Sequence, residues 1–182
     1  CNECVAKLIM TEMQRLKKIK MVIMDVDGVL SDGGIILDCQ GNENKVFNVY
    51  DGAAIAYLHY AGIKTAIITG RLSKTVSYRA KELGILEVHQ DTLQKVKPLN
   101  KILVKYKLSP DEICYIGDDL PDIPVMNRAG WAVAVRNARP EVLKYAHYVT
   151  RTNGGQGAVR EVAEKILKSQ NKWKLILDKY EA

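Results

Sequence analysis

The sequence predicts an α/β protein with a mainly parallel sheet and helices on both faces, in a Rossmann-like arrangement. Apolar runs alternate with helical patterns along most of the chain. The runs, such as residues 21–24 and 65–68, are rich in apolar and β-branched residues, as expected of strands that are buried on both faces. These patterns do not give the order of the strands.

The first elements are a helix, a strand, a hairpin and a second helix. Spaced apolar residues predict an amphipathic helix from Glu3 to Lys18, rather than a secretory signal. The strand follows in residues 20–28. Two β-rich arms around the turn "QGNEN" predict a hairpin flap over residues 33–49. Residues 52–62 predict a helix that ends at a glycine.

The middle of the chain predicts two further strand–helix pairs. Residues 63–70 form the first strand, and the helix over residues 72–84 ends at a glycine. Residues 86–90 look like a short strand. The helical pattern over residues 92–107 contains Pro98, so the helix is expected to begin near that residue.

The last part continues the alternation and ends in a tail over residues 169–182. Strands are predicted at residues 113–116, 131–135 and 147–150, with helices at residues 120–130, 138–146 and 154–170. The "GGQG" at the start of the last helix predicts a loop whose amides could meet an anion. The tail has apolar residues at helical spacing. Docking on its own core and docking on another subunit both remain open.

Composition indicates one domain over residues 1–182. The chain is 47% hydrophobic and 26% charged, which allows a packed core and argues against global disorder. No stretch approaches the roughly 20 apolar residues that cross a bilayer, so we expect no membrane partner. Cys1 and Cys4 have zinc-like spacing but no second ligand pair, and a reduced, cytoplasmic setting fits the cysteines.

The net charge of +6 first suggests nucleic acid as a partner. The lysines are spread along the chain, however, and no nucleic-acid-binding signature is present. We therefore expect no nucleic acid and a basic surface that attracts small anions.

Chemically active residues follow the predicted strands at their carboxyl ends, where ligands bind in open parallel sheets. These residues are Asp25 and Asp27 after the first strand, Thr69, Gly70 and Arg71 after the next, Lys95 and Lys97 beyond the short strand, and Asp118, Asp119 and Asp122 after residues 113–116. Clustered carboxylates require a compensating cation or a raised pKa. Oxygen ligands without nearby His or Cys favour Mg²⁺.

This set predicts phosphoryl transfer. Asp25 is the expected nucleophile and Asp27 the expected general acid and base. Thr69 would hydrogen-bond a phosphoryl oxygen, and Lys95 would neutralise negative charge. The predicted metal ligands are Asp25, Asp27 and Asp118, with Asp119 and Asp122 holding bound waters. Lys97 lies close enough to compete for the role of Lys95.

The same residues resemble the haloacid dehalogenase superfamily of phosphatases, in "DVDGVLSDG", "ITG", Lys95 and "GDDLPD". A closer resemblance, in "ITGR", "GDDLPDIPVM", "ARPEVL" and "GGQGAVREV", is to the family of phosphatases for 3-deoxy-D-manno-octulosonate (Kdo) 8-phosphate. That resemblance implies Mg²⁺-dependent hydrolysis in lipopolysaccharide synthesis. It also implies a homotetramer in which the hairpin and a neighbour's tail help enclose the site. Relatives usually have glycine where this chain has Asp91.

Spacing independently predicts a form without a large cap domain. Asp25 and Thr69 are 44 positions apart, and Thr69 and Lys95 are 26 apart, so the predicted elements fill both intervals. Arg71 is expected to bind the carboxylate of a sugar acid phosphate. Thr69, Gly70 and Lys95 are the other expected substrate-binding residues. The alternative is a surface arginine paired with a helix acid.

Three other functions compete with this one. A phosphatase for a nine-carbon sugar acid 9-phosphate is the main alternative, and relatives of that kind often differ after "TG". A signalling receiver domain also places acids, a threonine and a lysine at a sheet edge, but lacks an acid–base group such as Asp27. A non-catalytic regulatory subunit would not need the complete set of acids.

Overall fold

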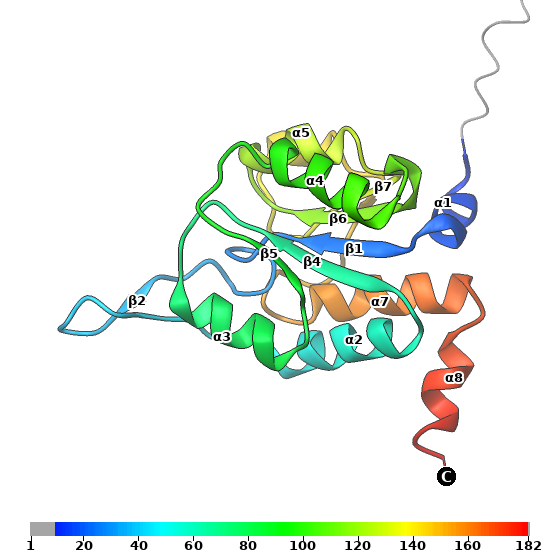
Figure 1. The fold of residues 1–182 in the computed structure, drawn as a ribbon, viewed down its shortest axis with the longest axis horizontal. Coiled ribbons are helices and arrows are strands. Elements are labelled where there is room, and N and C mark those ends of the chain that lie inside the picture. The colour runs from blue at the N-terminus through cyan, green and yellow to red at the C-terminus, as the bar shows by residue number, and fades with distance from the viewer. Residues whose placement is uncertain (1–9, 182) are drawn as a thin grey trace, which may run out of the picture.

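The computed structural model describes residues 10–181, and its centre is a parallel sheet (Figure 1). Its strands are β1 (Met21–Met24), β4 (Lys64–Ile68), β5 (Glu87–His89), β6 (Ile113–Gly117), β7 (Trp131–Ala134) and β8 (Tyr148–Val149). They are all parallel, in the order β5-β4-β1-β6-β7-β8. The predicted α/β fold with a mainly parallel sheet is confirmed.

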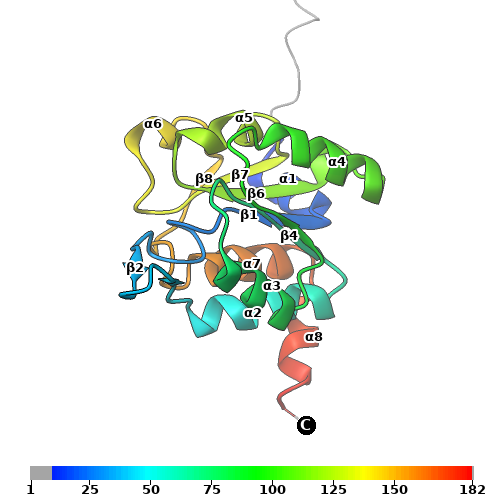
Figure 2. The same cartoon turned by 60° about the vertical axis from the view of Figure 1, so that its left-hand side comes forward.

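Helices cover both faces of this sheet, and both views show this arrangement (Figures 1 and 2). One face is covered by α2 (Val49–Tyr60), α3 (Lys74–Glu82) and α7 (Ala158–Ser169). The other is covered by α4 (Val96–Tyr106), α5 (Ile123–Met126) and α6 (Pro140–Leu143). Because each face is apolar, both layers of helices are needed to exclude water from the strands.

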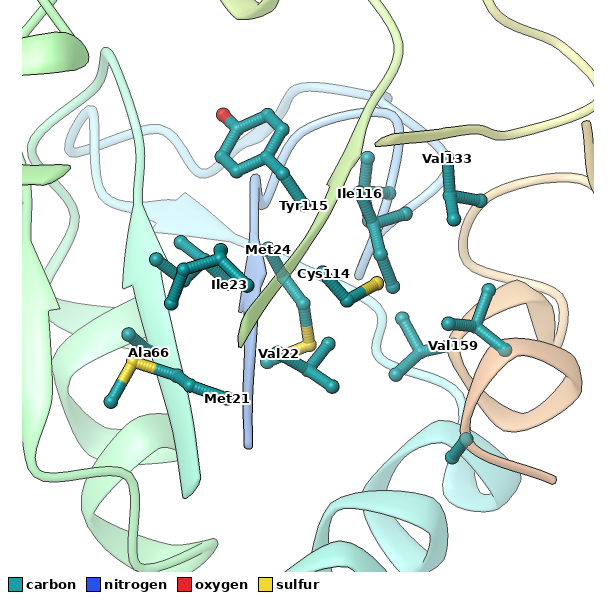
Figure 3. Close-up of a cluster of buried hydrophobic side chains, with 14 of the residues drawn as sticks. Met21, Val22, Ile23, Met24, Ala66, Cys114, Tyr115, Ile116, Val133 and Val159 are labelled. Atoms are coloured by element: carbon teal, nitrogen blue, oxygen red, sulfur yellow. The ribbon is translucent and has the colours of Figure 1, made fainter. Parts of the chain in front are cut away.

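The central strand β1 carries the core. Met21, Val22, Ile23 and Met24 are fully buried and lie between side chains of neighbouring strands and helices (Figure 3). Met24 pairs with Ile67 of β4 on one side and with Ile116 of β6 on the other. The residues that follow β1, β4 and β6 therefore leave the sheet side by side at its carboxyl edge.

The N-terminal helix is shorter than predicted within the described residues. It is α1 (Glu12–Lys18), and it begins after Thr11, whose side chain accepts a hydrogen bond from the backbone of Gln14. A capping box of this kind fixes the start of a helix. The predicted start at Glu3 and the Cys1–Cys4 pair lie outside the described residues.

The predicted hairpin is present as two short antiparallel strands, β2 (Ile36–Leu37) and β3 (Glu43–Asn44). It projects from the body of the molecule beyond α3 (Figure 1). The helix after it starts earlier than predicted, at Val49. Asn48 is the reason, because its side chain accepts a hydrogen bond from the backbone of Tyr50 and caps α2.

The tail forms helix α8 (Trp173–Asp178), which contacts its own chain. Ile176 is buried, and the Trp173 ring meets Tyr57 of α2 edge to face at 6.2 Å. The guanidinium of Arg160 lies 4.7 Å from the Tyr57 ring centroid and 5.3 Å from that of Trp173. The start of the tail is thus packed on α2 and α7. Across residues 10–181, no helix has the length and apolar character needed to cross a membrane.

Candidate active site

Carboxylates from two neighbouring strand ends meet at the carboxyl edge of the sheet. Asp25 follows β1, Asp118 follows β6, and Asp122 ends the short turn η2 (Leu120–Asp122). One oxygen from each of the three side chains lies within 4.8 Å of the others. Such crowding of acids in a partly buried place requires positive charge nearby.

Lys95 supplies part of that charge. It lies at the N-terminus of α4, and its Nζ is 2.9 Å from Oδ2 of Asp25 and 2.7 Å from Oδ1 of Asp122. The side chain is buried, whereas Lys97, two residues further along the chain, is exposed. The structure thus places Lys95, and not Lys97, among the acids.

Asp122 organises the loop after β6. Its fully buried carboxylate accepts hydrogen bonds from Lys95, from the hydroxyl of Tyr115 at 2.6 Å, and from the backbone amides of Asp118 and Asp119 at 2.9 and 3.2 Å. Its oxygens therefore contact protein groups, where the sequence had suggested bound waters. Asp119 is exposed, and its side chain accepts a hydrogen bond from Leu120 as a turn cap.

Lys95 does not balance all of the negative charge that the three carboxylates would carry. Burial, and then the Asp122 charge, raise the pKa of Asp25 to about 6 against the opposing effect of Lys95. Burial, followed by the charges of Asp25 and Asp122, raises the pKa of Asp118 to about 8. Oδ1 of Asp118 is buried and has no hydrogen-bond partner. Free, buried carboxylate oxygen is a ligand suited to a hard divalent cation.

Gly28 brings the first loop close to Asp118. Its φ is +87°, and a β-carbon there would lie 2.1 Å from Oδ2 of Asp118. The "GGQG" loop packs directly against Gly28, because a β-carbon on Gly154 would lie 1.7 Å from the carbonyl oxygen of Gly28. The anion at the amides of this loop is the buried Asp51, which accepts from Gly157 at 3.2 Å and from Arg160 at 2.8 Å.

Asp27 points to the hairpin and not into the acidic cluster. Its Oδ1 contacts Nζ of Lys45 and accepts a hydrogen bond from Ser31 at 3.4 Å. Its Oδ2 is 3.7 Å from Nε of Arg71. Because Lys45 holds this carboxylate on the hairpin side, the geometry does not support the prediction that the Asp27 side chain is a metal ligand.

Thr69, Gly70 and Arg71 leave β4 beside Asp25, as their position predicted. Thr69 is buried, and its amide donates to His89 at 2.9 Å. Arg71 is half-exposed, and its Nη2 lies 2.7 Å from Oε1 of Glu43. The acid that pairs with this arginine therefore comes from the hairpin.

Comparisons with known proteins agree with this geometry. A model of haloacid dehalogenase-like hydrolases matches residues 73–162. The chain is 48% identical over 159 residues to the 3-deoxy-D-manno-octulosonate 8-phosphate phosphatase of Yersinia pestis, covering 87% of this chain and 85% of that protein. The chain belongs to the haloacid dehalogenase-like hydrolases. The resemblance predicted from the motifs is confirmed.

The fold of this haloacid dehalogenase-like hydrolase is also similar to that of two crystal structures. The Yersinia pestis phosphatase gives a TM-score of 0.88 at 47% identity, covering 89% of this chain and 88% of that one. The Moraxella catarrhalis phosphatase, in complex with magnesium, phosphate and Kdo, gives 0.90 at 43% identity, covering 92% and 97%.

Three residues near the site of this hydrolase are not identified by the sequence patterns. The patterns place Tyr115 only in a strand, and Glu43 and Lys45 only in a hairpin arm. A signal for the last two was present, since residues two apart on a strand share one face. Glu43 in β3 and Lys45 directly after it thus place opposite charges on one side of the hairpin arm. Their partners, Asp27 and Arg71, lie too far away in sequence for any local pattern to identify.

Proposed function

We propose that this chain hydrolyses 3-deoxy-D-manno-octulosonate 8-phosphate to Kdo and phosphate through an aspartyl-phosphate on Asp25. One observation carries the proposal. The buried Lys95 lies between Asp25 and Asp122, beside an unpartnered oxygen of Asp118, in a chain 48% identical to a phosphatase for this substrate. The nine-carbon alternative is not favoured.

The first chemical step uses Asp25 and Asp27. A carboxylate oxygen of Asp25 forms a bond to phosphorus, while the bond from phosphorus to the sugar oxygen breaks with its electron pair on that oxygen. Asp27 gives its proton to the departing oxygen, so that Kdo leaves as an alcohol. Lys95 holds Asp25 in place and reduces its repulsion of the phosphate.

The second step restores the enzyme. A water molecule gives a proton to Asp27, and its oxygen forms a bond to phosphorus as the bond to Asp25 breaks. Phosphate leaves, Asp25 is again a carboxylate and Asp27 again carries a proton. One side chain therefore acts first as acid and then as base.

The residues present fit a magnesium ion. Asp25 and Asp118 would hold it, because they offer close carboxylate oxygens, one of them without any partner, and both pKa values are raised, first by burial and then by the neighbouring carboxylates. When bound, Mg²⁺ supplies positive charge that offsets repulsion between the nucleophile and the phosphate. Thr69 and Gly70 would contact the phosphoryl oxygens, and Arg71 the carboxylate of the sugar acid.

The test is phosphate release from a panel of substrates with Mg²⁺ present. We expect a kcat/KM for Kdo 8-phosphate at least about 10-fold above that for a nine-carbon sugar acid 9-phosphate. Asp25→Asn should lower kcat at least about 1,000-fold while circular dichroism stays unchanged. A preference for the nine-carbon substrate, or full activity in Asp25→Asn, would overturn the proposal.

The proposal includes an assembly and a setting. Residues 1–182 are proposed as one phosphatase domain, with the hairpin at residues 33–49 as its flap and residues 169–182 as its tail.

Several apolar side chains on and next to the hairpin are about half exposed or more, namely Ile35, Ile36, Leu37, Val46 and Val49. Exposed apolar patches of this kind support association, and a homotetramer is proposed, to be checked by light scattering. Cytoplasmic location and a role in lipopolysaccharide synthesis stay predictions.

A further inference from the structure

Lys45 is a buried cation that the hairpin contributes to the edge of the site. Its side chain is 1% exposed, and its Nζ contacts Oδ1 of Asp27 and lies 3.2 Å from Oε1 of Glu43. A lysine is almost never this buried unless it is paired. Here both partners are acids, and one of them is the proposed general acid and base.

The second arm of the hairpin is fixed to the body of the molecule by polar contacts. The carboxylate of Glu43 accepts from Arg71, at the end of β4, at 2.7 Å. Its backbone oxygen accepts from the hydroxyl of Thr75 on α3 at 2.9 Å. The side chain and the backbone of Glu43 both fix this arm to the body of the molecule. The position of Lys45 relative to Asp27 is therefore fixed as well.

We propose that Lys45 is a positioning residue that holds the Asp27 carboxylate in the orientation needed for proton transfer. This inference rests on the proposed function. Lys45 occupies Oδ1 of Asp27, which leaves Oδ2 for the proton that the leaving oxygen receives. Without Lys45, the Asp27 carboxylate keeps two long contacts, the hydrogen bond from Ser31 to Oδ1 at 3.4 Å and Nε of Arg71 at 3.7 Å from Oδ2. These contacts are too weak to prevent the short side chain from rotating away.

A positioning role predicts an effect that depends on the leaving group. A sugar alkoxide leaves only with a proton, and general acid catalysis contributes about 10²- to 10⁴-fold to such steps. p-Nitrophenolate is a stable anion and leaves without protonation. A hairpin that merely holds the fold together would affect both substrates by the same factor.

The experiment measures kcat/KM for Kdo 8-phosphate and for p-nitrophenyl phosphate in the full-length chain with Mg²⁺. Lys45→Met removes the charge, and Lys45→Arg retains it. Lys81→Met is the matched control, because Lys81 is exposed on α3. Thermal unfolding of each variant reports folding, and Lys45→Gln serves as a second neutral variant if Lys45→Met is unstable.

We expect Lys45→Met to lower kcat/KM about 100-fold for Kdo 8-phosphate and less than about 3-fold for p-nitrophenyl phosphate. A burst of p-nitrophenolate should appear, because the second step also needs Asp27. Lys45→Arg should recover most of the activity, and Lys81→Met should match the unmodified chain. Equal losses on both substrates, or no loss on either, would overturn the role of Lys45. An unmodified chain that cleaves p-nitrophenyl phosphate but not Kdo 8-phosphate would instead refute the proposed substrate, and another sugar phosphate that it hydrolyses would then test Lys45.

Discussion

The ammonium group of Lys95 lies 2.7 Å from a carboxylate oxygen of Asp122, and both side chains are withdrawn from solvent. Asp122 also accepts from Tyr115 and from two backbone amides. Removing one partner of a buried pair leaves the other charge uncompensated.

Asp122→Ala is therefore expected to lower the free energy of unfolding by about 3 kcal/mol. Asp119→Ala is the control, because it removes an exposed acid that only caps a turn, and a lost cap costs about 1 kcal/mol. Urea unfolding of both variants measures the difference. Equal losses would mean that the Asp122 network contributes nothing beyond a cap.

Gly28→Ala should disturb Asp118 as well as the backbone. Gly28 and Gly62 both have positive φ, +87° and +78°, but a β-carbon meets Asp118 only at Gly28 and meets nothing within 4 Å at Gly62. Gly62→Ala is expected to cost about 1 kcal/mol of stability from backbone strain alone. Gly28→Ala should cost about 2 kcal/mol more and abolish the rise in melting temperature caused by Mg²⁺. Thermal scans with and without Mg²⁺ test this, and an unchanged Mg²⁺ effect in Gly28→Ala would contradict it.

The metal-free protein should lose stability as pH rises. The folded-state pKa of Asp118 is about 8, whereas an aspartate in the unfolded chain titrates near 4. Between these values the folded state binds the extra proton, so the free energy of unfolding falls with increasing pH. Asp25 acts in the same direction up to its pKa of about 6.

We expect a loss on the order of 2 kcal/mol between pH 5 and pH 8 in EDTA, measured by urea unfolding. Mg²⁺ should stabilise the protein more at pH 8 than at pH 5, because the ligands must be ionised to bind it. Asp118→Asn should flatten the pH dependence. A steep dependence that persists in this variant would assign the effect to other groups.

The backbone of Asp91 adopts a conformation that favours glycine. Its φ is +55°, in the left-handed region, which explains why the resemblance places glycine at this position. Asp91→Gly is expected to raise the free energy of unfolding by about 0.5–1 kcal/mol through relief of this strain. Asp91→Ala removes the same carboxylate but keeps the β-carbon, and should give no gain. Chemical unfolding of the pair distinguishes strain from charge.

Much of this protein could be predicted from local patterns. The apolar runs around residues 21–24 and 113–117 require burial on both faces, which implies a parallel sheet between layers of helices. Acids placed directly after those runs must then gather at one edge. That reasoning alone predicts that Asp25 and Asp118 lie together. The same patterns did not indicate that α1 starts at Glu12, because periodicity does not register a cap such as Thr11.

By itself, the sequence determined the order of the elements, the edge where the chemistry lies and the oxygen-rich character of the site, since burial and strand direction follow from residue type. Only the tertiary structure decided that Lys95 and not Lys97 joins the acids, that Asp122 bonds to Lys95, and that Lys45 holds Asp27. The Lys45–Asp27 and Lys95–Asp122 contacts join residues 18 and 27 positions apart. They depend on strand order and on the path of loops, which periodicity along the chain does not encode.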